Sequence, residues 1–315
     1  MSNFTLLAQL SFYIAYIMRC TAIKNCLPDV QRDTPSVRLA VDKVCVHSFR
    51  VKVCLKSSNN SAECQPGTVS ACVDVHEGLR GIHVSRSVEA VLKTINSVAH
   101  LSLADIQHSL KAVAESLLMK HEYSSKASVK LRLELLYTMV DADTIPVTLT
   151  VSVRLGMEGS ERYSIGIAFE GMSVCPCAQQ VYAFLENIPA PHTPSHSQRA
   201  LLSIRIDSPT PVSIEVSEVA KALLSAFSAP VKSFLKRDEE YRLVKRAFEN
   251  PKFAEDIARE AMYVLYKAFQ DRLSPRSRIA VKVLSFESVH PFNLYAEIRR
   301  SVEELSKAFS SGEVR

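Results

Sequence analysis

The chain has 315 residues, of which 47% are hydrophobic and 23% charged, a balance typical of a globular protein with one large or two smaller domains. Its formal net charge of +5 is mildly basic, which favours anionic ligands such as nucleotides. The sequence contains neither a dense run of lysine and arginine nor a basic patch interleaved with aromatic residues, so we expect no nucleic-acid partner.

Residues 1–26 are predicted to form an N-terminal extension. Within it, the apolar stretch from Phe4 to Met18 is shorter than a bilayer span, is interrupted by Gln9 and Ser11, and follows no basic region. We therefore expect a cytoplasmic protein with no membrane partner, and Met18 is a candidate start of the native chain.

Eight cysteines are spread over the chain. Cys45, Cys54 and Cys72 lie in or beside apolar, strand-like runs, where a reduced thiol packs as a small hydrophobic side chain. The sequence therefore predicts reduced cysteines in a cytosolic protein.

The first half of the chain is predicted to run in the order strands, two helices, strands. The expected strands are 38–55, 69–75, 127–140 and 145–155, the expected helices are 87–99 and 103–122, and 59–67 is expected to be a loop. Turn-forming residues at 141–144 join the last two strands into a pair.

The second half repeats this order with different residues. Its expected strands are 162–174, 199–206, 278–286 and 292–299, and its expected helices are 218–227, 239–249 and 253–272. Runs of strands separated from runs of helices favour an α+β fold with antiparallel sheets. We place the boundary between two modules near 156–161, which gives a first module at 27–158 and a second at 159–315.

The stretch GMSVCPCAQQ at 171–180 places two thiols around one proline at the end of a predicted strand. A single intervening residue is too short for a structural zinc knuckle or a thioredoxin-like redox pair. Taken alone, Cys175 and Cys177 are equally well explained as a buried strand end.

Common nucleotide and esterase motifs are absent, because the sequence has no Walker loop, no G-x-G-x-x-G and no G-x-S-x-G, and only 8 glycines. The second half instead offers metal-ligand side chains at the ends of elements: Cys175, Cys177, His192, His196, Glu239, Glu240 and His290. One cysteine, two histidines and one carboxylate suit zinc or ferrous iron. Each residue alone also has a structural explanation, such as a solvated loop for His196 or a solvated helix start for Glu239 and Glu240.

Glu255 lies near the start of a predicted helix whose N-terminus is marked by Asn250 and Pro251. It falls outside the apolar stripe of that helix, and its charge favours the positive end of the helix dipole. This alone is sufficient reason for an acidic residue there.

Together these segments resemble the type IB GTP cyclohydrolases, most of all the iron-dependent archaeal branch that opens methanopterin biosynthesis. The motifs that carry the resemblance are LPDVQ at 27–31, RGIHVSR at 80–86, VCPCAQ at 174–179, SHSQR at 195–199, LKRDEEY at 235–241, NPKFAED at 250–256 and FESVHPFNLYAE at 286–297. They occur in the family's order and cover nearly the whole chain beyond the first 26 residues.

The resemblance implies a set of site residues. The metal ligands would be Cys175, His196, Glu240 and His290, with Cys175 and His196 at the centre of catalysis. Glu255 would bind the guanine edge, since one carboxylate can accept both N1–H and the exocyclic amine. Contacts to ribose or phosphate would come from His83, Ser85 and Arg86.

Three departures from the family pattern affect this assignment. Phe292 stands where the family commonly has a second histidine. The usual proline before the acidic pair is missing, and counting back eleven residues from Pro251 selects Glu240, with Glu239 as the alternative. The insertion IPAPHTPS makes His192 a rival ligand.

The resemblance also implies a fold and a reaction. The fold is the tunnelling fold, in tandem α+β modules that associate as a homodimer or homotetramer. The reaction is hydrolytic opening of the guanine imidazole ring of GTP with release of formate, using Fe²⁺, or alternatively Mn²⁺ or Zn²⁺, at one ion per subunit. The archaeal product is 7,8-dihydroneopterin 2′,3′-cyclic phosphate with pyrophosphate, and the bacterial alternative is 7,8-dihydroneopterin triphosphate.

Two readings from other classes remain open at this point. A tunnelling-fold nitrile oxidoreductase would use a cysteine as a covalent nucleophile with a nicotinamide cofactor and would act without metal. A non-catalytic purine- or pterin-binding protein would bind its ligand without releasing formate.

Overall fold

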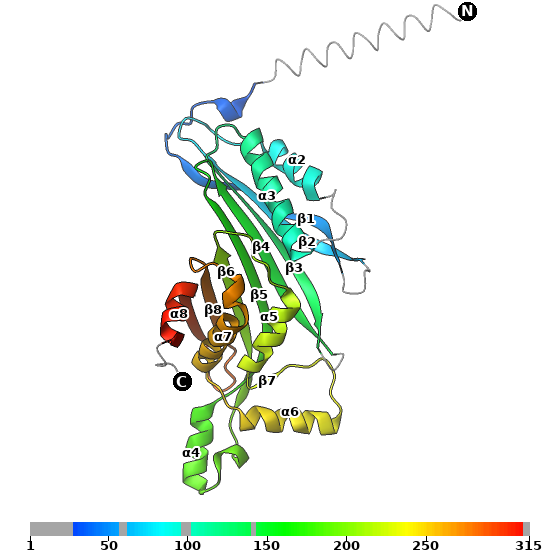
Figure 1. Ribbon diagram of the computed structural model, residues 1–315, viewed down its shortest axis with the longest axis vertical. Coiled ribbons are helices and arrows are strands. Elements are labelled where there is room, and N and C mark those ends of the chain that lie inside the picture. Colours follow the sequence, from blue (N-terminus) through cyan, green and yellow to red (C-terminus); the bar gives the residue numbers. More distant parts are fainter. Residues whose placement is uncertain (1–27, 57–61, 96–101, 140–142, 311–315) are drawn as a thin grey trace, which may run out of the picture.

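The computed structural model describes residues 28–56, 62–95, 102–139 and 143–310, and these form one antiparallel sheet flanked by helices (Figure 1). The strands pair in the order β1-β2-β3-β4-β5-β6-β8-β9, and the short β7 pairs with β5. The strands are β1 Val41–Lys56, β2 Ala62–Val75, β3 Lys126–Thr138, β4 Thr144–Gly156, β5 Glu161–Val174, β6 Ser197–Ser208, β7 Ala229–Pro230, β8 Arg278–Ser285 and β9 Leu294–Ser301.

The helices fall into the same two sets that the sequence predicts, with two additions. The α-helices are α2 Val84–Ile95, α3 Leu103–Lys120, α4 Pro176–Glu186, α5 Val216–Leu223, α6 Arg237–Glu249, α7 Ala254–Phe269 and α8 Val302–Ser310, and the 3-10 turns are η1 Val30–Arg32, η2 Ala190–His192, η3 Leu224–Ala226 and η4 Gln270–Arg272. No helix in the described ranges combines the length and the apolar character needed to cross a bilayer.

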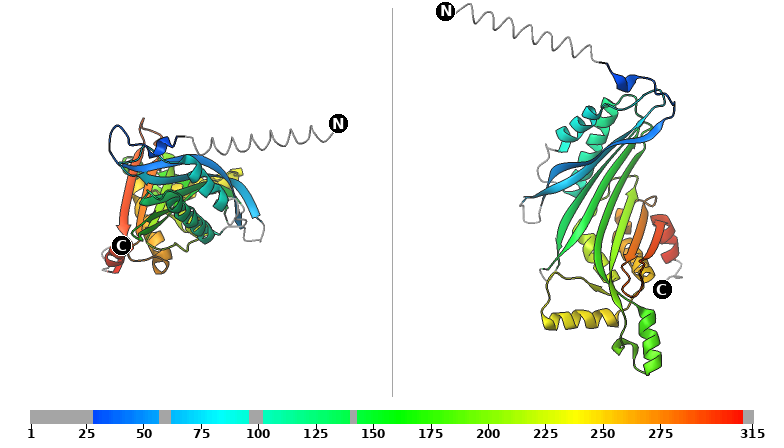
Figure 2. Two further views of the ribbon diagram at one scale, coloured as in Figure 1. Left: turned by 90° about the horizontal axis from the view of Figure 1, so that it is seen from above. Right: turned by 180° about the vertical axis from the view of Figure 1, so that it is seen from behind.

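The core lies between one face of the sheet and the helices that cover it (Figures 1 and 2). Along β4, Val147, Val151 and Val153 are buried, whereas the intervening Thr150 and Ser152 are half-buried on the opposite face. Antiparallel sheets with one covered face show this alternation. Helix α3 packs on β3 and β4, and α7 packs on β8 and β9, so each half of the sheet has its own helical cover.

The predicted boundary between modules falls in the turn that joins β4 to β5. Leu155 pairs with Glu161 across this hairpin, and the sheet continues from one half into the other. Before the turn the order is strands, helices, strands, and after it the same order occurs with the additional helix α4 between β5 and β6.

The prediction of a loop at 59–67 is wrong for its described part, because β2 begins at Ala62. Pro66 and the polar residues around it resemble a loop in sequence. In the structure Pro66 pairs with Lys52 of β1, while the pairing of β2 with β3 starts only at Gly67. Pro66 therefore needs no backbone N–H toward β3, which is the condition under which a strand tolerates proline.

The prediction of reduced thiols at Cys45, Cys54 and Cys72 is also wrong. Cys45 is bonded to Cys72 and Cys54 to Cys64, in two disulfides that link β1 to β2. Each pair is directly opposite in the register of the two strands, with Cα atoms 4.0 and 3.9 Å apart. Alternation along each strand could not reveal this register, which depends on the length and shape of the hairpin.

Helices α4 and α8 are not among the predicted helices, although both begin with a recognisable signal. Cys175 caps α4, and Pro176 occupies its first turn, a position that proline favours. At α8, Ser301 Oγ accepts a hydrogen bond from the N–H of Glu304, and Glu304 Oε2 accepts one from the N–H of Ser301. This reciprocal capping box is visible in the sequence as Ser-x-x-Glu.

Candidate functional site

Cys175 and His196 are neighbours at the paired ends of β5 and β6. The last pair of the two strands is Val174 with Ser197, and the next residue along the chain donates its N–H to the carbonyl of His196 over 3.1 Å. Because the strands are antiparallel, the residue that leaves β5 must meet the residue that enters β6. The topology thus brings two of the predicted metal ligands together although they belong to different strands and are far apart along the chain.

The Cys-Pro-Cys stretch turns β5 into α4. Cys175 is half-buried, and the N–H of Ala178 in the first turn donates to its Sγ over 3.5 Å. Ser195 Oγ donates to the carbonyl of Cys175 over 2.6 Å, which ties the strand end to the segment before β6. Cys177 is exposed, so the interpretation of the pair as a buried strand end does not hold.

His196 is held in one ring orientation by Gln198. Its Nδ1 lies 3.0 Å from Gln198 Oε1, and Gln198 Nε2 donates to Ser173 Oγ over 3.5 Å. An amide oxygen can only accept, so this contact requires a proton on Nδ1 and leaves Nε2 as the ring nitrogen that a metal could use. A neutral imidazole with a free Nε2 is the form that binds metals.

The segment after β8 reaches the same end of the sheet. Ser288 Oγ lies 3.5 Å from Nδ1 of His196. His290, two residues further on, is exposed and stacks on Phe292, with ring centroids 5.0 Å apart and an interplanar angle of 4°. The phenyl ring that replaces a second family histidine thus packs against the predicted ligand.

Helix α6 supplies the predicted carboxylate. Glu239 Oε2 accepts the N–H of Lys236 over 2.8 Å and so caps the start of the helix. Glu240 is exposed, and its backbone N–H bonds to the carbonyl of Lys236. The cap occupies one carboxylate of the pair, which leaves Glu240 as the better candidate for a ligand.

Among the residues that the structure describes, no three His, Cys, Asp or Glu side chains lie close enough to hold a metal ion. The structure therefore brings Cys175 and His196 together but does not gather Glu240, His290 or the rival His192 around them. The donor chemistry of the adjacent pair, one thiol and one imidazole with a free Nε2, nevertheless fits a divalent metal.

The start of α7 lies beside the end of β5. Lys252 donates its N–H to the carbonyl of Val174 over 3.0 Å, in an isolated bridge, and its buried Nζ pairs with Glu260 at 2.6 Å. Glu255 follows in the first turn of α7 and is exposed. The predicted guanine-binding carboxylate thus belongs to the same end of the molecule as Cys175.

The other predicted substrate-binding residues lie at the opposite end, where η1 and the start of α2 meet (Figure 1). His83 Nε2 is 2.9 Å from Asp29 Oδ1, and Arg86 donates to the carbonyl of Lys120 over 2.9 Å. Ser85 is exposed. Within one chain, these three residues are therefore not brought to Cys175.

A polar network that was not predicted from the sequence lies beneath His83. The hydroxyl of Tyr123 lies 3.4 Å from Nδ1 of His83 and 2.8 Å from Nδ1 of the buried His121, whose Nε2 is 2.9 Å from Ser87 Oγ. Burial, helped by the charge of Arg86, lowers the pKa of His121 to about 4. In the sequence, His121 lies in the last turn of the predicted helix 103–122 and Tyr123 follows directly after that helix, which gave no indication of the network.

Comparison with known proteins adds a family and a fold. Residues 27–296 match the family described as type I GTP cyclohydrolase folE2. The chain is 33% identical over 282 residues to the GTP cyclohydrolase MptA of Aeropyrum pernix, covering 88% of this chain and 97% of the relative. It is 31% identical over 289 residues to the protein of the same name from Thermoplasma acidophilum, covering 89% and 97%.

The backbone is similar to the crystal structure of uricase from Arthrobacter globiformis, with a TM-score of 0.52 and 10% sequence identity over 85% of this chain and 96% of the uricase. At this identity the likeness shows the fold alone. It confirms the predicted α+β tunnelling fold, with antiparallel strands and helices on one face.

Proposed function

The chain belongs to the type I GTP cyclohydrolase family, and on this premise we propose that it is a metal-dependent hydrolase that opens the imidazole ring of guanine in GTP and releases formate. The observation that carries the proposal is the pairing of Cys175 with His196 at the joined ends of β5 and β6. These are the thiol and imidazole that would hold the metal, and they stand in the motifs by which the chain resembles the family.

The metal would be Fe²⁺, or alternatively Mn²⁺ or Zn²⁺, at one ion per subunit, held by Cys175 and His196 with Glu240 and His290 completing the set. A divalent ion bound there would supply the Lewis acidity that allows water to attack C8 of guanine at neutral pH. The protein's own contribution begins with orientation. Gln198 fixes the ring of His196, and the first turn of α4 directs the N–H of Ala178 toward the sulfur of Cys175.

Guanine recognition is assigned to Glu255, whose carboxylate can accept N1–H and the exocyclic amine together. Its exposure at the start of α7, next to the end of β5, leaves it accessible to a ligand. Contacts to ribose or phosphate are assigned to His83, Ser85 and Arg86, of which His83 is positioned by Asp29 and Tyr123.

A homodimer or homotetramer is part of the proposal, because one chain holds these two groups of residues at opposite ends (Figure 1). A complete nucleotide site then requires the His83 end of one copy next to the Cys175 end of another. Exposed apolar side chains on α4 support such contacts, since Phe184 is 85% exposed and Leu185 72% exposed. Apolar groups gathered on one surface favour burial against a partner.

The product is assigned as 7,8-dihydroneopterin 2′,3′-cyclic phosphate with pyrophosphate, in a cytoplasmic pathway to tetrahydromethanopterin. The similarity to proteins named MptA, which covers nearly the whole length of both chains, favours this output over 7,8-dihydroneopterin triphosphate.

Anaerobic incubation of the purified protein with GTP and Fe²⁺, Mn²⁺ or Zn²⁺ tests the proposal. We expect formate, together with a pterin that fluoresces after oxidation and whose phosphate state is read by mass spectrometry. Absence of formate with all three metals would remove the cyclohydrolase assignment and leave a binding protein. Turnover that needs a nicotinamide cofactor but no metal would instead indicate a nitrile oxidoreductase.

Two variants separate the reaction from the ligand assignment. Cys175→Ala should lose metal and formate release together, whereas Cys177→Ala, the neighbouring exposed thiol, should keep both. A fully active Cys175→Ala protein would overturn the role of that sulfur but not the reaction.

A further inference from the structure

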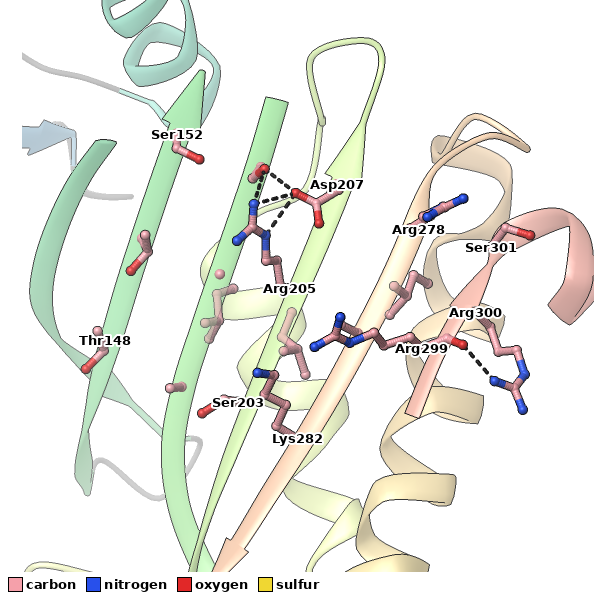
Figure 3. Close-up of a pocket in the computed structure, with 18 of the residues that line it drawn as sticks. Thr148, Ser152, Ser203, Arg205, Asp207, Arg278, Lys282, Arg299, Arg300 and Ser301 are labelled. Carbon is pink, nitrogen blue, oxygen red and sulfur yellow. Dashed lines mark hydrogen bonds and ion pairs between the residues drawn. The ribbon is translucent and has the colours of Figure 1, made fainter. Parts of the chain in front are cut away.

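The sheet face opposite the helices contains a hollow of 720 Å³ over β4, β5, β6, β8 and β9 (Figure 3). Six basic and two acidic residues line it. The basic residues are Lys130, Arg205, Arg278, Lys282, Arg299 and Arg300, and the acidic residues are Asp207 and Glu304. The lining therefore carries a net positive charge, and a hollow lined by one sign of charge concentrates counter-ions.

The strand register explains the shape of the hollow. Gly166 pairs with Thr150 on one side and Arg205 on the other, and Ala280 pairs with Arg205 and Arg299. Directly opposed residues of an antiparallel sheet point to the same face. The small Gly166 and Ala280 thus form a low floor between longer basic side chains.

The next row along the strands adds two further cations to the rim. Lys130 pairs with Ser152, and Arg278 pairs with both Asp207 and Ser301 in the strand register. Among the described residues, neither Lys130 nor Arg278 forms an ion pair with a carboxylate. The charge of Lys130 is therefore available to an incoming anion, and that of Arg278 is offset only by a through-space interaction with Glu304.

Three of the remaining cations are partly neutralised, and Arg300 donates to the backbone carbonyl of Arg299. Arg205 pairs with Asp207 at 2.8 Å, and Glu297 accepts both Lys282, at 3.7 Å, and Arg299. Figure 3 shows the side chains of Arg205, Lys282 and Arg299 over the face of the strands. The hydroxyls of Thr150, Ser152, Ser203 and Ser301 add neutral donors around them, whereas those of Thr148 and Ser164 already donate to Glu134 and Asp207.

We propose that this basic hollow binds linked phosphate groups, as in pyrophosphate or the triphosphate of a nucleotide. Guanidinium groups and hydroxyls are the donors that bind phosphate oxygens, and the volume lies in the range of ligand pockets, roughly 300–1,000 Å³. None of the described residues that line the hollow is aromatic, so it offers no surface on which a base would stack. The phosphate chain is therefore the part that it recognises.

The hollow is separate from the Cys175 end. Ala168, its lining residue on β5 nearest to that end, precedes Cys175 by seven residues of extended chain, which corresponds to roughly 23 Å at 3.3 Å per residue. An anion in the hollow and a guanine ring beside Cys175 would thus occupy different places on one chain.

Titration calorimetry of the full-length protein with sodium pyrophosphate tests the proposal. We expect one site per chain whose affinity falls as salt rises, and at least tenfold weaker binding by the double variant Lys130→Ala/Arg278→Ala. The control is Lys221→Ala/Arg246→Ala, which removes the same charge from exposed positions on α5 and α6 and should bind within twofold of the unmodified protein. Equal binding by the two double variants, with circular dichroism showing both folded, would overturn the site.

Competition experiments identify the source of the phosphate. A variant of the Cys175 end tests whether pyrophosphate binds there instead of in the hollow. Displacement of pyrophosphate by GTP would assign the hollow to a nucleotide triphosphate, and failure of GTP to compete would assign it to free pyrophosphate. Displacement by guanosine, which has no phosphate, would contradict the proposal. Cys175→Ala/His196→Ala should bind pyrophosphate unchanged, whether or not the protein is a cyclohydrolase, and loss of binding in that variant would place the anion elsewhere.

Discussion

Gln198 Oε1 lies 3.0 Å from Nδ1 of His196. Gln198 belongs to β6, which begins directly after His196. This contact requires a proton on Nδ1 and leaves Nε2 as the nitrogen that would bind a metal. The hydrogen bond from Gln198 Nε2 to Ser173 Oγ keeps the amide oxygen Oε1 directed at the His196 ring. The orientation of the imidazole therefore depends on two residues that bind no metal themselves.

Replacing Gln198 with leucine should weaken metal binding by about 10- to 100-fold, the usual effect of losing such a supporting contact. The physical reason is that Nδ1 loses its acceptor, so the ring can rotate or change tautomer. Metal titration followed by elemental analysis of the dialysed protein measures the effect without any assay of activity. Gln198→Glu restores an acceptor and should recover much of the affinity. Metal binding by Gln198→Leu that equals that of the unmodified protein would refute the positioning role.

The two disulfides between β1 and β2 should stabilise the protein by about 2–4 kcal/mol each, because each closes a loop in the unfolded chain. Urea unfolding with and without a strong reductant, in the Cys175→Ser/Cys177→Ser background, measures the difference. Alkylation and mass spectrometry of the untreated protein should find Cys45, Cys54, Cys64 and Cys72 protected. Alkylation of these four in the folded protein would contradict the pairing.

Acidification below pH 6.5 should destabilise the fold through His121. Burial, then the charges of Arg86, His83 and Lys120, lower its folded pKa to about 4, whereas an unfolded histidine titrates near 6.5. The unfolded chain therefore binds the proton more readily between these values, and stability is lost as the pH falls through this window. The shift corresponds to an upper figure of about 3 kcal/mol.

The measurement is the free energy of unfolding in urea at pH 7, 5.5 and 4 for the unmodified protein and for His121→Gln. Other groups titrate in the same range, so the difference between the two proteins is the informative quantity. His121→Gln should be less stable at pH 7 and should lose less stability toward pH 4. Parallel pH profiles for the two proteins would show that His121 does not carry the effect.

Gly171 should not tolerate a larger residue. A Cβ at this position of β5 would overlap the ring of the buried Phe227, which packs edge-on against Phe169 at 5.8 Å. Gly171→Ala should destabilise the protein by about 1–3 kcal/mol, the usual cost of overpacking a core. Gly166→Ala on the same strand meets only ordinary contacts and serves as the control in thermal unfolding. Equal melting temperatures for the two variants would disprove the clash.

Alternation of apolar residues was sufficient to place most strands, because a sheet with one covered face imposes period two on the sequence. It did not reveal how strands are aligned. The register that joins Cys45 to Cys72, and the edge position that allows Pro66 within β2, depend on contacts with β1 that a single segment does not contain.

In the candidate site, too, some positions could be predicted from the sequence and others could not. The adjacency of Cys175 and His196 follows from two antiparallel strands, so the sequence order already contained it. The positions of Glu240 and His290 depend on segments outside the sheet, and the motif at 80–86 lies at the start of α2, at the opposite end of the molecule from α4. Their assignment as ligands or substrate contacts rests on resemblance and stays a prediction.

The opposite placement of His83 and Cys175 has a genetic consequence. If each working centre combines one end from each of two copies, a chain damaged only at His83 and a chain damaged only at Cys175 are both inactive alone, yet a mixture of them contains some junctions with both ends intact. Two such alleles expressed in one cell would rescue each other, whereas two alleles damaged at the same end would not.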